Sequence, residues 1–561
     1  MGDIRYAKDI RYPVAKLRES NMSNAKKDGF IMQAGILALA GIIVRIIGIL
    51  YRSPLTGIIG DEGNGYYSSA YNIYTIILLI SSYSIPSAIS KVIAQYLALK
   101  EYRNAHKIFH CAFVYVIVVG GIASLFAFFG AGVLVSDNCV MVLKVFAPTI
   151  FLSGLLGVLR GYFQAHRTMV QTSFSQIIEQ ILNAIVSLLA AYLLMQTVSD
   201  RDLTTQAVYG AVGSALGTGS GVLIALLFMY MVYRLNRNLI LKRVRRDKHH
   251  EELSYGQIFK IIFTMVTPFI LSTFIYNFST SLNQTIYTKI METAKHLTEA
   301  EIATGYGIFA GKAVVISNIP IAIATSISAA MIPSISGSFA QGNYEKSRGQ
   351  VNMAVKTTML ISIPCAAGLF VLAKPVTQLL FPQRASLDLA ASLLRVISVS
   401  VIFYALSTLT NAVLQGIGRV NVPVINAAVA LVLQTAVLVP LLYADFSLYA
   451  LAIAMIVYSF AMCVLNNIAV RNFLAYQQEW VKTFVLPLLA SVVMGVAAFG
   501  VYKGLYCLIQ INVIALFAAI FVAVIVYFIV VIKCRALSEE ELLTVPKGRM
   551  LVRMLRKVHI L

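Results

Sequence analysis

The sequence predicts an all-α integral membrane protein that crosses the bilayer many times. Of its 561 residues, 59% are hydrophobic and only 12% are charged, about half the ~25% charged content of soluble domains. Apolar runs of the length needed to cross a hydrocarbon core of ~30 Å recur along the chain, as at 31–50, 485–501 and 511–532. Because a soluble protein must keep a polar surface, burial in a core does not explain this composition.

The apolar windows between charged or Gly/Pro-rich breaks predict about fourteen transmembrane helices. We place them near residues 30–51, 66–90, 108–134, 141–163, 172–195, 207–233, 258–288, 303–333, 350–373, 389–414, 420–443, 446–470, 481–502 and 510–532. An even number of spans puts the two termini on the same side of the membrane.

The distribution of Lys and Arg indicates which side that is. On this map, 33 of the 45 basic residues lie in the tails and in alternate loops, and about eight lie in the opposite loops. The positive-inside rule therefore predicts that both termini are cytoplasmic. The net charge of +21 is explained by basic segments that face anionic membrane lipids, and we expect no nucleic-acid partner.

An internal repeat predicts two lobes of six helices each. IPSAIS at 85–90 corresponds to IPSIS at 332–336, and YFQAHR at 162–167 corresponds to LQGIGR at 414–419, both at an offset of about 250 residues. The predicted organisation is a cytoplasmic basic tail (1–29), an N-terminal lobe (30–233), a cytoplasmic basic loop (234–257), a C-terminal lobe (258–471), two extra helices (472–532) and a basic amphipathic cytoplasmic tail (533–561). Two facing lobes are typical of an alternating-access transporter.

Ionisable side chains inside apolar spans are candidates for function, because each costs roughly 2.5–3.5 kcal/mol at mid-helix. Arg45 and Arg52 are two turns apart in the first predicted helix, which puts them on one face and about 10 Å apart. Lys312 lies well inside the eighth helix. We predict that these three cations line a wet cavity and bind an anionic group. For Arg52, a side chain that extends to the lipid headgroups is the alternative.

Glu179 is the acid that lies deep in a predicted span, about two turns into the fifth helix. We expect it in the substrate cavity, and pairing with a cation or polar neighbour is the structural alternative. Lys356 and Arg395 lie close to the starts of their helices. We expect both side chains to extend to the headgroups, without a role in transport.

Polar side chains form stripes at helical spacing. The fifth helix carries Thr172, Gln176, Glu179, Asn183 and Ser187, the seventh carries Ser272, Tyr276, Ser279, Asn283 and Tyr287, and the second carries Ser68, Asn72 and Thr75. One stripe alone is typical of hydrogen bonds between helices. Several stripes together, with cations dominating the deep charges, predict a hydrated and net positive cavity. Gln176, Asn183, Asn72 and Asn283 are then candidate substrate-binding side chains.

The sequence contains no pattern for catalysis or metal binding. Its histidines form no ligand motif, and no loop combines acids and histidines as a metal-dependent transferase requires. The six cysteines are scattered and predict packing residues, not a metal site or a disulfide framework. The sequence favours a transporter over an enzyme, with no catalytic residue, metal or cofactor.

Several stretches carry a family resemblance. They are VRIIGILYR at 44–52, IGDEGNGYY at 59–67, IPSAISK at 85–91, LRGYFQ at 159–164, SQIIEQ at 175–180 and PKGR at 546–549. Together they resemble the stage V sporulation protein B / MurJ-like polysaccharide exporters of the multidrug/oligosaccharidyl-lipid/polysaccharide (MOP) flippase superfamily. The likeness extends from about residue 26 onward.

The resemblance implies a two-lobed fold of fourteen helices in the bacterial cytoplasmic membrane. It also implies that the chain flips lipid II or another undecaprenyl-pyrophosphate-linked saccharide by alternating access. In such relatives, arginines of the first helix line the central cavity, and Arg45 and Arg52 match them. Lys312 approximates a cavity arginine of the eighth helix. The acidic ligands of a sodium site known in some relatives are not evident, so coupling to the membrane potential, H⁺ or Na⁺ stays open.

Two alternatives come from other functional classes. A cation-coupled multidrug exporter of the same superfamily is favoured by twelve helices and an acidic cavity. A membrane-embedded glycosyltransferase or scaffold for wall synthesis needs catalytic acids in a loop. The sequence shows none of these features, and it implies no oligomer.

Overall fold

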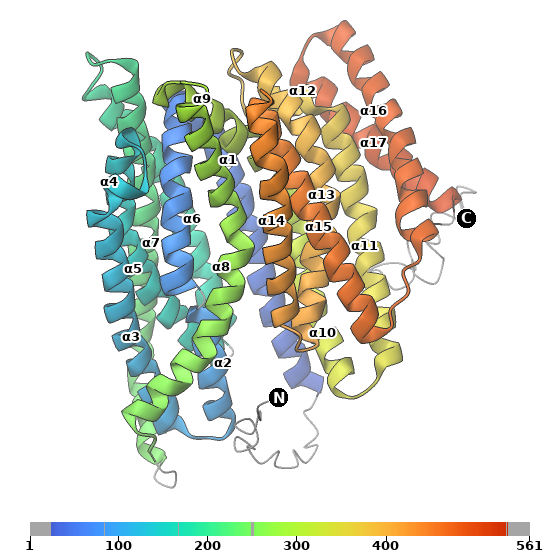
Figure 1. The fold of residues 1–561 in the computed structure, drawn as a ribbon. Helices are drawn as coiled ribbons and strands as arrows, with labels where there is room; N and C mark the ends of the chain where they lie inside the picture. The colour runs from blue at the N-terminus through green and yellow to red at the C-terminus, as the bar shows by residue number, and fades with distance from the viewer. Residues whose placement is uncertain (1–23, 84, 167, 248–251, 535, 537–561) are drawn as a thin grey trace.

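The computed structural model describes residues 24–83, 85–166, 168–247, 252–534 and 536, and every regular element in these ranges is a helix (Figure 1). The N-lobe comprises α1 (Asn24–Leu78), α2 (Ile85–Ala98), α3 (Tyr102–Phe129), α4 (Ala131–Leu134), α5 (Asp137–Ala165), α6 (Met169–Gln196) and α7 (Leu203–Arg246). The C-lobe comprises α8 (Tyr255–Thr293), α9 (Glu299–Ile308), α10 (Val314–Ala340), α11 (Tyr344–Val371), α12 (Ala373–Leu380), α13 (Leu387–Gly416), α14 (Asn421–Tyr443) and α15 (Ser447–Leu474). The extra pair is α16 (Leu486–Ile509) and α17 (Asn512–Lys533), and three short π-helical segments are η1 (Leu79–Tyr83), η2 (Phe309–Ala313) and η3 (Val481–Val485).

The helix α1 reverses direction at Gly60, whose φ of 72° lies in the left-handed region. Across this bend, the Asn64 side-chain amide donates a hydrogen bond of 3.2 Å to the Thr56 hydroxyl. Eight residues of a straight helix would separate these positions by about 12 Å. The first and second predicted spans are therefore two helical arms of α1, joined directly at the non-helical Gly60.

The all-helical, multi-pass fold is confirmed. Twelve helices among the described residues are long and apolar enough to cross a membrane, and one of them contains both arms of α1. The 39-residue helix α8 is not among the twelve. A total of fourteen requires counting the two arms separately and adding α8, so that number stays a prediction.

The two lobes repeat one packing pattern, as the internal repeat predicts. In the N-lobe, α5 packs against α3 and α7, and α7 also packs against α6. In the C-lobe, α13 packs against α11 and α15, and α15 also packs against α14. The extra helices α16 and α17 pack on each other and on α11 and α12. Figure 1 shows the two lobes side by side, with the α16–α17 pair at the outer edge of the C-lobe.

The lobes touch at the end of the bundle where α1 bends. Here α9 and η2 of the C-lobe pack against α1, and glycines allow the backbones to come close. A Cβ atom on Gly65 would lie 1.9 Å from the Ala303 carbonyl oxygen, and one on Gly307 would lie 2.0 Å from that of Asp61. Any larger side chain at these two positions would push the lobes apart. Asn138 at the start of α5 also donates to Glu299 of α9, from its backbone at 3.1 Å and its side chain at 3.0 Å.

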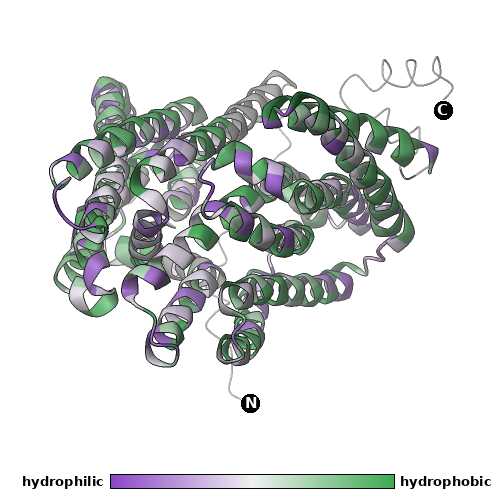
Figure 2. Cartoon of the chain, turned by 90° about the horizontal axis from the view of Figure 1, so that it is seen from above, coloured by the Kyte–Doolittle hydropathy of each residue, from purple (hydrophilic) through white to green (hydrophobic). Residues whose placement is uncertain are grey.

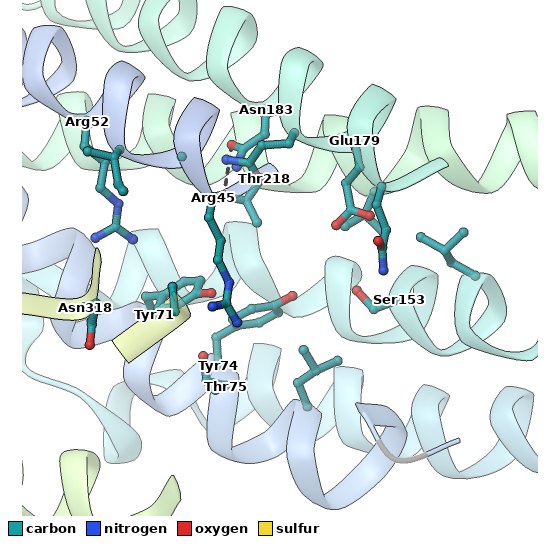
Figure 3. Close-up of a pocket in the computed structure, with 18 of the residues that line it drawn as sticks. Arg45, Arg52, Tyr71, Tyr74, Thr75, Ser153, Glu179, Asn183, Thr218 and Asn318 are labelled. Atoms are coloured by element: carbon teal, nitrogen blue, oxygen red, sulfur yellow. Dashed lines mark hydrogen bonds between the residues drawn. The ribbon is translucent and has the colours of Figure 1, made fainter. Parts of the chain in front are cut away.

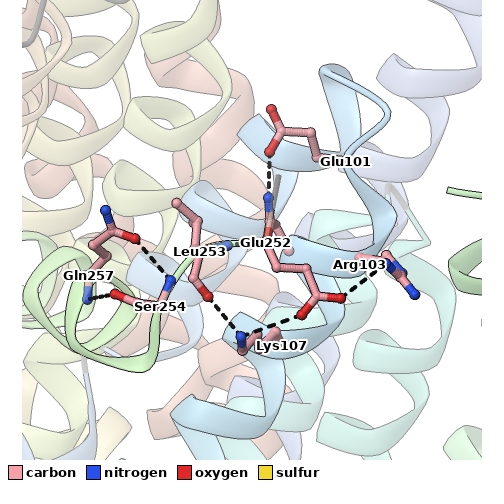
Figure 4. A network of polar contacts seen from close by, with 8 residues as sticks. Glu101, Arg103, Lys107, Glu252, Leu253, Ser254 and Gln257 are labelled. Atoms are coloured by element: carbon pink, nitrogen blue, oxygen red, sulfur yellow. Dashed lines mark hydrogen bonds and ion pairs between the residues drawn. The ribbon is translucent and has the colours of Figure 1, made fainter. Parts of the chain in front are cut away.

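At the opposite end, the segment that enters α8 is held on α3 (Figure 4). Glu252 pairs with Arg103 at 3.0 Å and with Lys107 at 3.7 Å, and Lys107 also donates to the Leu253 carbonyl at 2.7 Å. A reciprocal capping box between Ser254 and Gln257 then begins α8. The start of α8 therefore belongs to the N-lobe, whereas its far end packs in the core of the C-lobe.

Two predicted boundaries differ from the observed helices. The segment 234–257, expected to be a loop, is helical as far as Arg246. It has no Gly or Pro in this part, and Leu, Lys and Arg are good helix formers. Of the predicted tail 1–29, residues 24–29 form the start of α1. Beyond Cys534, only Ala536 of the predicted C-terminal tail lies within the described residues.

Hydrophobic residues are frequent along the helices, most of all in the outer ones (Figure 2). Large apolar side chains are exposed along the whole bundle, including Phe129, Val432 and Phe521. Such a surface is stable only in contact with lipid, so the protein is a multi-pass membrane protein.

The asymmetric distribution of Lys and Arg predicts which turns are cytoplasmic. Thiol labelling of intact cells tests on which side of the membrane each turn lies. In a background where the exposed Cys507 and Cys534 are replaced by serine, Asp200→Cys in the exposed α6–α7 turn should react with a membrane-impermeant maleimide. The matched variant Asn343→Cys, in the exposed α10–α11 turn, should react only after the cells are opened. The reverse pattern would invert the predicted topology.

Candidate functional site

A cavity of about 790 Å³ lies between the lobes. Its walls come from both arms of α1 and from α5, α6, α7 and α10. The N-lobe supplies most of the lining, including all of its charged side chains, and the C-lobe adds Asn318, Thr325 and apolar residues of α10. The cavity continues from the lobe contact toward the end of α5 and the start of α6, where Gln164 and Gln176 line it.

Arg45 and Arg52 both line this cavity, as their spacing predicts. Arg45 is exposed and Arg52 is half-buried. Figure 3 shows both side chains extending from the first arm of α1 toward the second arm, which carries Tyr71 and Tyr74. Both guanidinium groups are therefore reachable from the cavity.

A third guanidinium group in the cavity belongs to Arg160 of α5, which the sequence reasoning did not single out. Arg160 forms an ion pair of 2.6 Å with Glu179 and donates to the Ser175 hydroxyl at 2.8 Å. Glu179 lines the cavity and also has the cationic partner that was the structural alternative. The signal for Arg160 was its place in the LRGYFQ stretch, next to a predicted helix end.

The polar residues on one face of α6 have two different roles, according to their position along the helix. The middle residues Gln176, Glu179 and Asn183 line the cavity. Nearer the α6–α7 turn, the buried Ser187 donates to the Asn183 side chain at 3.0 Å and to the Ser214 carbonyl of α7 at 3.1 Å. The stripe therefore contributes both a cavity wall and a contact between helices.

A second cavity of about 470 Å³ adjoins the first and shares Arg52, Tyr67 and Tyr71 with it. Asn72 and Asn283 line this second cavity. Asn72 donates to Gln284 at 2.6 Å and to Tyr306 at 2.7 Å, which links α1 to the C-lobe. Asn283 accepts a hydrogen bond of 2.9 Å from Gln434, whose side-chain oxygen accepts one from Ser279.

Lys312 is not where the sequence reasoning expected it. Its side chain is 1% exposed, lies 2.6 Å from Asp61 and donates to the Ser386 hydroxyl at 2.6 Å. It lines none of the described cavities, so it does not converge with Arg45 and Arg52. The prediction relied on the depth of Lys312 in the apolar span, and depth does not show whether a side chain faces a cavity or a buried partner; here it lies in the π-helical turn η2 and faces Asp61.

The expectation for Lys356 was also wrong. Its side chain is buried at 5% exposure within α11 and does not extend to the headgroups. Position near the start of a helix does not reveal whether a residue faces lipid or a neighbouring helix. Arg395 is exposed on α13, which is compatible with the expectation that its side chain extends to the headgroups.

The charges of the cavity determine what it can bind. Three guanidinium groups face one carboxylate, so the lining is net positive inside the membrane. Guanidinium groups bind phosphate oxygens through paired hydrogen bonds, and amide and hydroxyl groups suit a saccharide. Within the described residues, no group of three or more His, Cys, Asp or Glu side chains forms a metal site.

Comparison with known proteins connects this geometry to a family. Residues 31–339 match the family described as polysaccharide biosynthesis protein, and residues 308–440 match the MatE family. The lipid II flippase MurJ of Bacillus subtilis is 27% identical over 82% of this chain and 86% of its own length. Stage V sporulation protein B of the same organism is 23% identical over 94% of this chain and all of its own length.

Solved structures share the fold. A lipid II flippase MurJ in an inward closed conformation aligns with a TM-score of 0.64 at 15% identity, over 88% of this chain and 97% of that one. An outward-facing multidrug resistance MATE transporter of the MOP superfamily aligns with a TM-score of 0.58 at 15% identity, over 80% of this chain and 96% of that one. The chain is thus a membrane transporter and not an enzyme. It belongs to the polysaccharide biosynthesis protein family and has the fold of the MOP superfamily.

Proposed function

We propose that this chain flips an undecaprenyl-pyrophosphate-linked saccharide across the cytoplasmic membrane by alternating access. The substrate is lipid II or a related precursor of the cell wall or of a polysaccharide. The observation that carries this proposal is the net positive cavity between the lobes, with Arg45, Arg52 and Arg160 against the single carboxylate of Glu179. The similarity to a lipid II flippase over most of the chain supports it.

The cavity suits the headgroup of such a lipid. Its volume of about 790 Å³ is in the range of sites that enclose a sizeable ligand, roughly 300–1,000 Å³. In our account Arg45 and Arg52 bind the pyrophosphate, and Gln176 and Asn183 bind the saccharide, with Asn72 and Asn283 of the adjoining cavity available to the far sugar. The polyprenyl chain stays in the bilayer.

Alternating access follows from the two ends of the lobe interface. The end at Gly60 is closed by glycine-mediated packing and by the Lys312–Asp61 ion pair. The cavity lies on the other side of this contact and extends toward the ends of α5 and α6, which the charge asymmetry assigns to the cytoplasm. Loading from the inside and separation of the lobes at Gly60 would then expose the headgroup outward.

The charged residues that line the two cavities also indicate which gradient could drive transport and whether the chain could be a multidrug exporter. Glu179 is the one carboxylate among the described lining residues of both cavities, so a coupled proton would be carried there. Coupling to the membrane potential alone needs no further carboxylate. A cationic drug would meet a net positive wall, which disfavours a multidrug exporter.

The phosphate contact predicts a graded effect of substitutions at Arg45. Arg45→Ala should abolish transport and Arg45→Lys should impair it partly, because lysine keeps the charge and loses the paired hydrogen bonds. Loss of one charge-assisted hydrogen bond costs about 1.5–3 kcal/mol, roughly a ten- to hundredfold loss of affinity. The assay is leaflet-resolved lipid II accumulation in cells depleted of their own flippase, normalised to membrane abundance. Arg395→Ala is the control, and equal complementation by Arg45→Ala would contradict the proposal.

The Arg160–Glu179 pair predicts a second effect. Glu179→Gln should leave the protein folded and reduce transport, because Arg160 loses its partner and the cavity gains one net positive charge. The double variant Arg160→Gln/Glu179→Gln keeps the net charge and serves as the matched control. Normal transport by Glu179→Gln at every pH tested would make Glu179 a packing residue.

The Lys312–Asp61 pair predicts a loss of stability instead of a loss of substrate binding. Breaking a buried ion pair by removing one partner costs about 3–5 kcal/mol, so Lys312→Met should lower the melting temperature of the purified protein. Asp61→Asn/Lys312→Met removes both charges and should recover most of this loss. If the double variant melts as low as the single one, Asp61 is not the partner that holds Lys312.

A further inference from the structure

A separate polar pocket of about 250 Å³ lies within the N-lobe, between α3, α5, α6 and α7. It is near the end where α5 stops and α6 begins, and it shares no lining residue with the central cavity. Its polar side chains include His106, His166, Gln171, Asn236 and Arg243, and the rest of the lining is mostly aromatic or apolar. Among the described residues, no carboxylate lines it.

Two polar atoms of this pocket have no partner. Among the described residues, the Nδ1 atom of His106 and the Oε1 atom of Gln171 are buried and make no hydrogen bond. Leaving such a group unsatisfied costs about 1–3 kcal/mol, so a buried one calls for a missing ligand or water. The His106 Nδ1 can donate to an anion in one tautomer, whereas the Gln171 oxygen only accepts and suits a water molecule. The imidazole rings are held in place, since His106 contacts His110 at 4.4 Å and His166 contacts Tyr162 at 4.5 Å between ring centroids.

The pocket is electropositive. Arg243 is exposed at its rim. The pKa of His166 is below its ordinary value, chiefly because of burial and also because of the Arg243 charge, although a hydrogen bond to the Tyr162 carbonyl opposes the shift. The cation therefore acts on the interior of the pocket, and the part of the lining that the structure describes holds no carboxylate to neutralise it.

We propose that this pocket binds a phosphate group. Arg243 can donate paired hydrogen bonds to phosphate oxygens, the Asn236 amide has a second N–H beyond the one it donates to Val232, and the His106 Nδ1 can donate in its Nδ1–H tautomer. The site is independent of the transported substrate, because it lies in one lobe and lines no part of the central cavity.

The surroundings favour a membrane phospholipid over free phosphate as the source. The last turns of α7 expose Leu235 at 71% and Leu239 at 64% beside Arg237, Arg245 and Arg246. Exposed apolar side chains among cations are typical of a helix at the boundary between headgroups and acyl chains. A phosphodiester headgroup at that depth reaches Arg243, and Leu239, which also lines the pocket, contacts the glycerol backbone.

Isothermal titration of the full chain in neutral detergent tests this site. The titrants are dihexanoyl-phosphatidylglycerol, dihexanoylglycerol (which lacks the phosphate) and inorganic phosphate. The experiment is run in the Arg45→Ala background as well as in the native chain, so that a signal from the central cavity is removed. Arg243→Gln is compared with Arg245→Gln, which removes the same charge from the same helix outside the pocket.

We expect saturable binding of phosphatidylglycerol in both backgrounds, about tenfold weaker in Arg243→Gln and changed less than about twofold in Arg245→Gln. Dihexanoylglycerol should not bind. Binding of inorganic phosphate as tightly as the lipid would keep the phosphate site and make free phosphate its ligand. If Arg243→Gln and Arg245→Gln weaken phosphatidylglycerol binding equally, the lipid is attracted only to the charged surface of α7, and the proposal is overturned. Loss of phosphatidylglycerol binding in the Arg45→Ala background would also overturn it, because the binding would then belong to the central cavity.

Discussion

A charged side chain inside a bilayer must be either paired or hydrated, and this constraint determines the place of each cation within the helical bundle of this transporter. Lys312 is paired with Asp61 and excluded from the described cavities. Arg160 is paired with Glu179 at the cavity wall. Arg45 is exposed in the cavity itself. The first ion pair joins the lobes, the second sets the charge of the wall, and Arg45 lines the cavity in which the proposed substrate anion would bind.

This division of charge makes the two lobes unequal. All charged lining of the central cavity comes from the N-lobe, whereas the C-lobe contributes neutral polar and apolar residues of α10. The C-lobe instead supplies Lys312 and the glycine surface of α9 and η2 that close the contact with α1. In the proposed cycle the pyrophosphate-binding arginines of the central cavity therefore stay in the N-lobe. Motion of the C-lobe changes the side of the membrane to which the central cavity opens. The long helix α8 begins on the N-lobe and ends in the C-lobe, so it must bend or pivot during this motion.

The sequence predicted what depends on local pattern. Hydropathy and repeat spacing predicted the helical lobes, and the two-turn separation of Arg45 and Arg52 predicted their shared cavity. It could not predict Lys312 correctly, because its depth in the apolar span does not reveal its direction and its partner Asp61 is remote in sequence. Arg160 was missed because a cation near a helix end looks like a topology signal. The burial of Lys356 depends on which neighbour packs against α11, which no periodicity reveals.

The central claim is that guanidinium groups of the N-lobe recognise the pyrophosphate of a polyprenyl lipid. Equilibrium binding in phosphatidylcholine nanodiscs, followed by native mass spectrometry, tests this directly by comparing undecaprenyl pyrophosphate with undecaprenol. Our account predicts that one undecaprenyl pyrophosphate remains bound per chain, that undecaprenol does not, and that the complex weakens at least about tenfold when Arg45 and Arg52 are both replaced by glutamine. Equal retention of the two lipids, or unchanged retention of the pyrophosphate by that variant, would contradict it.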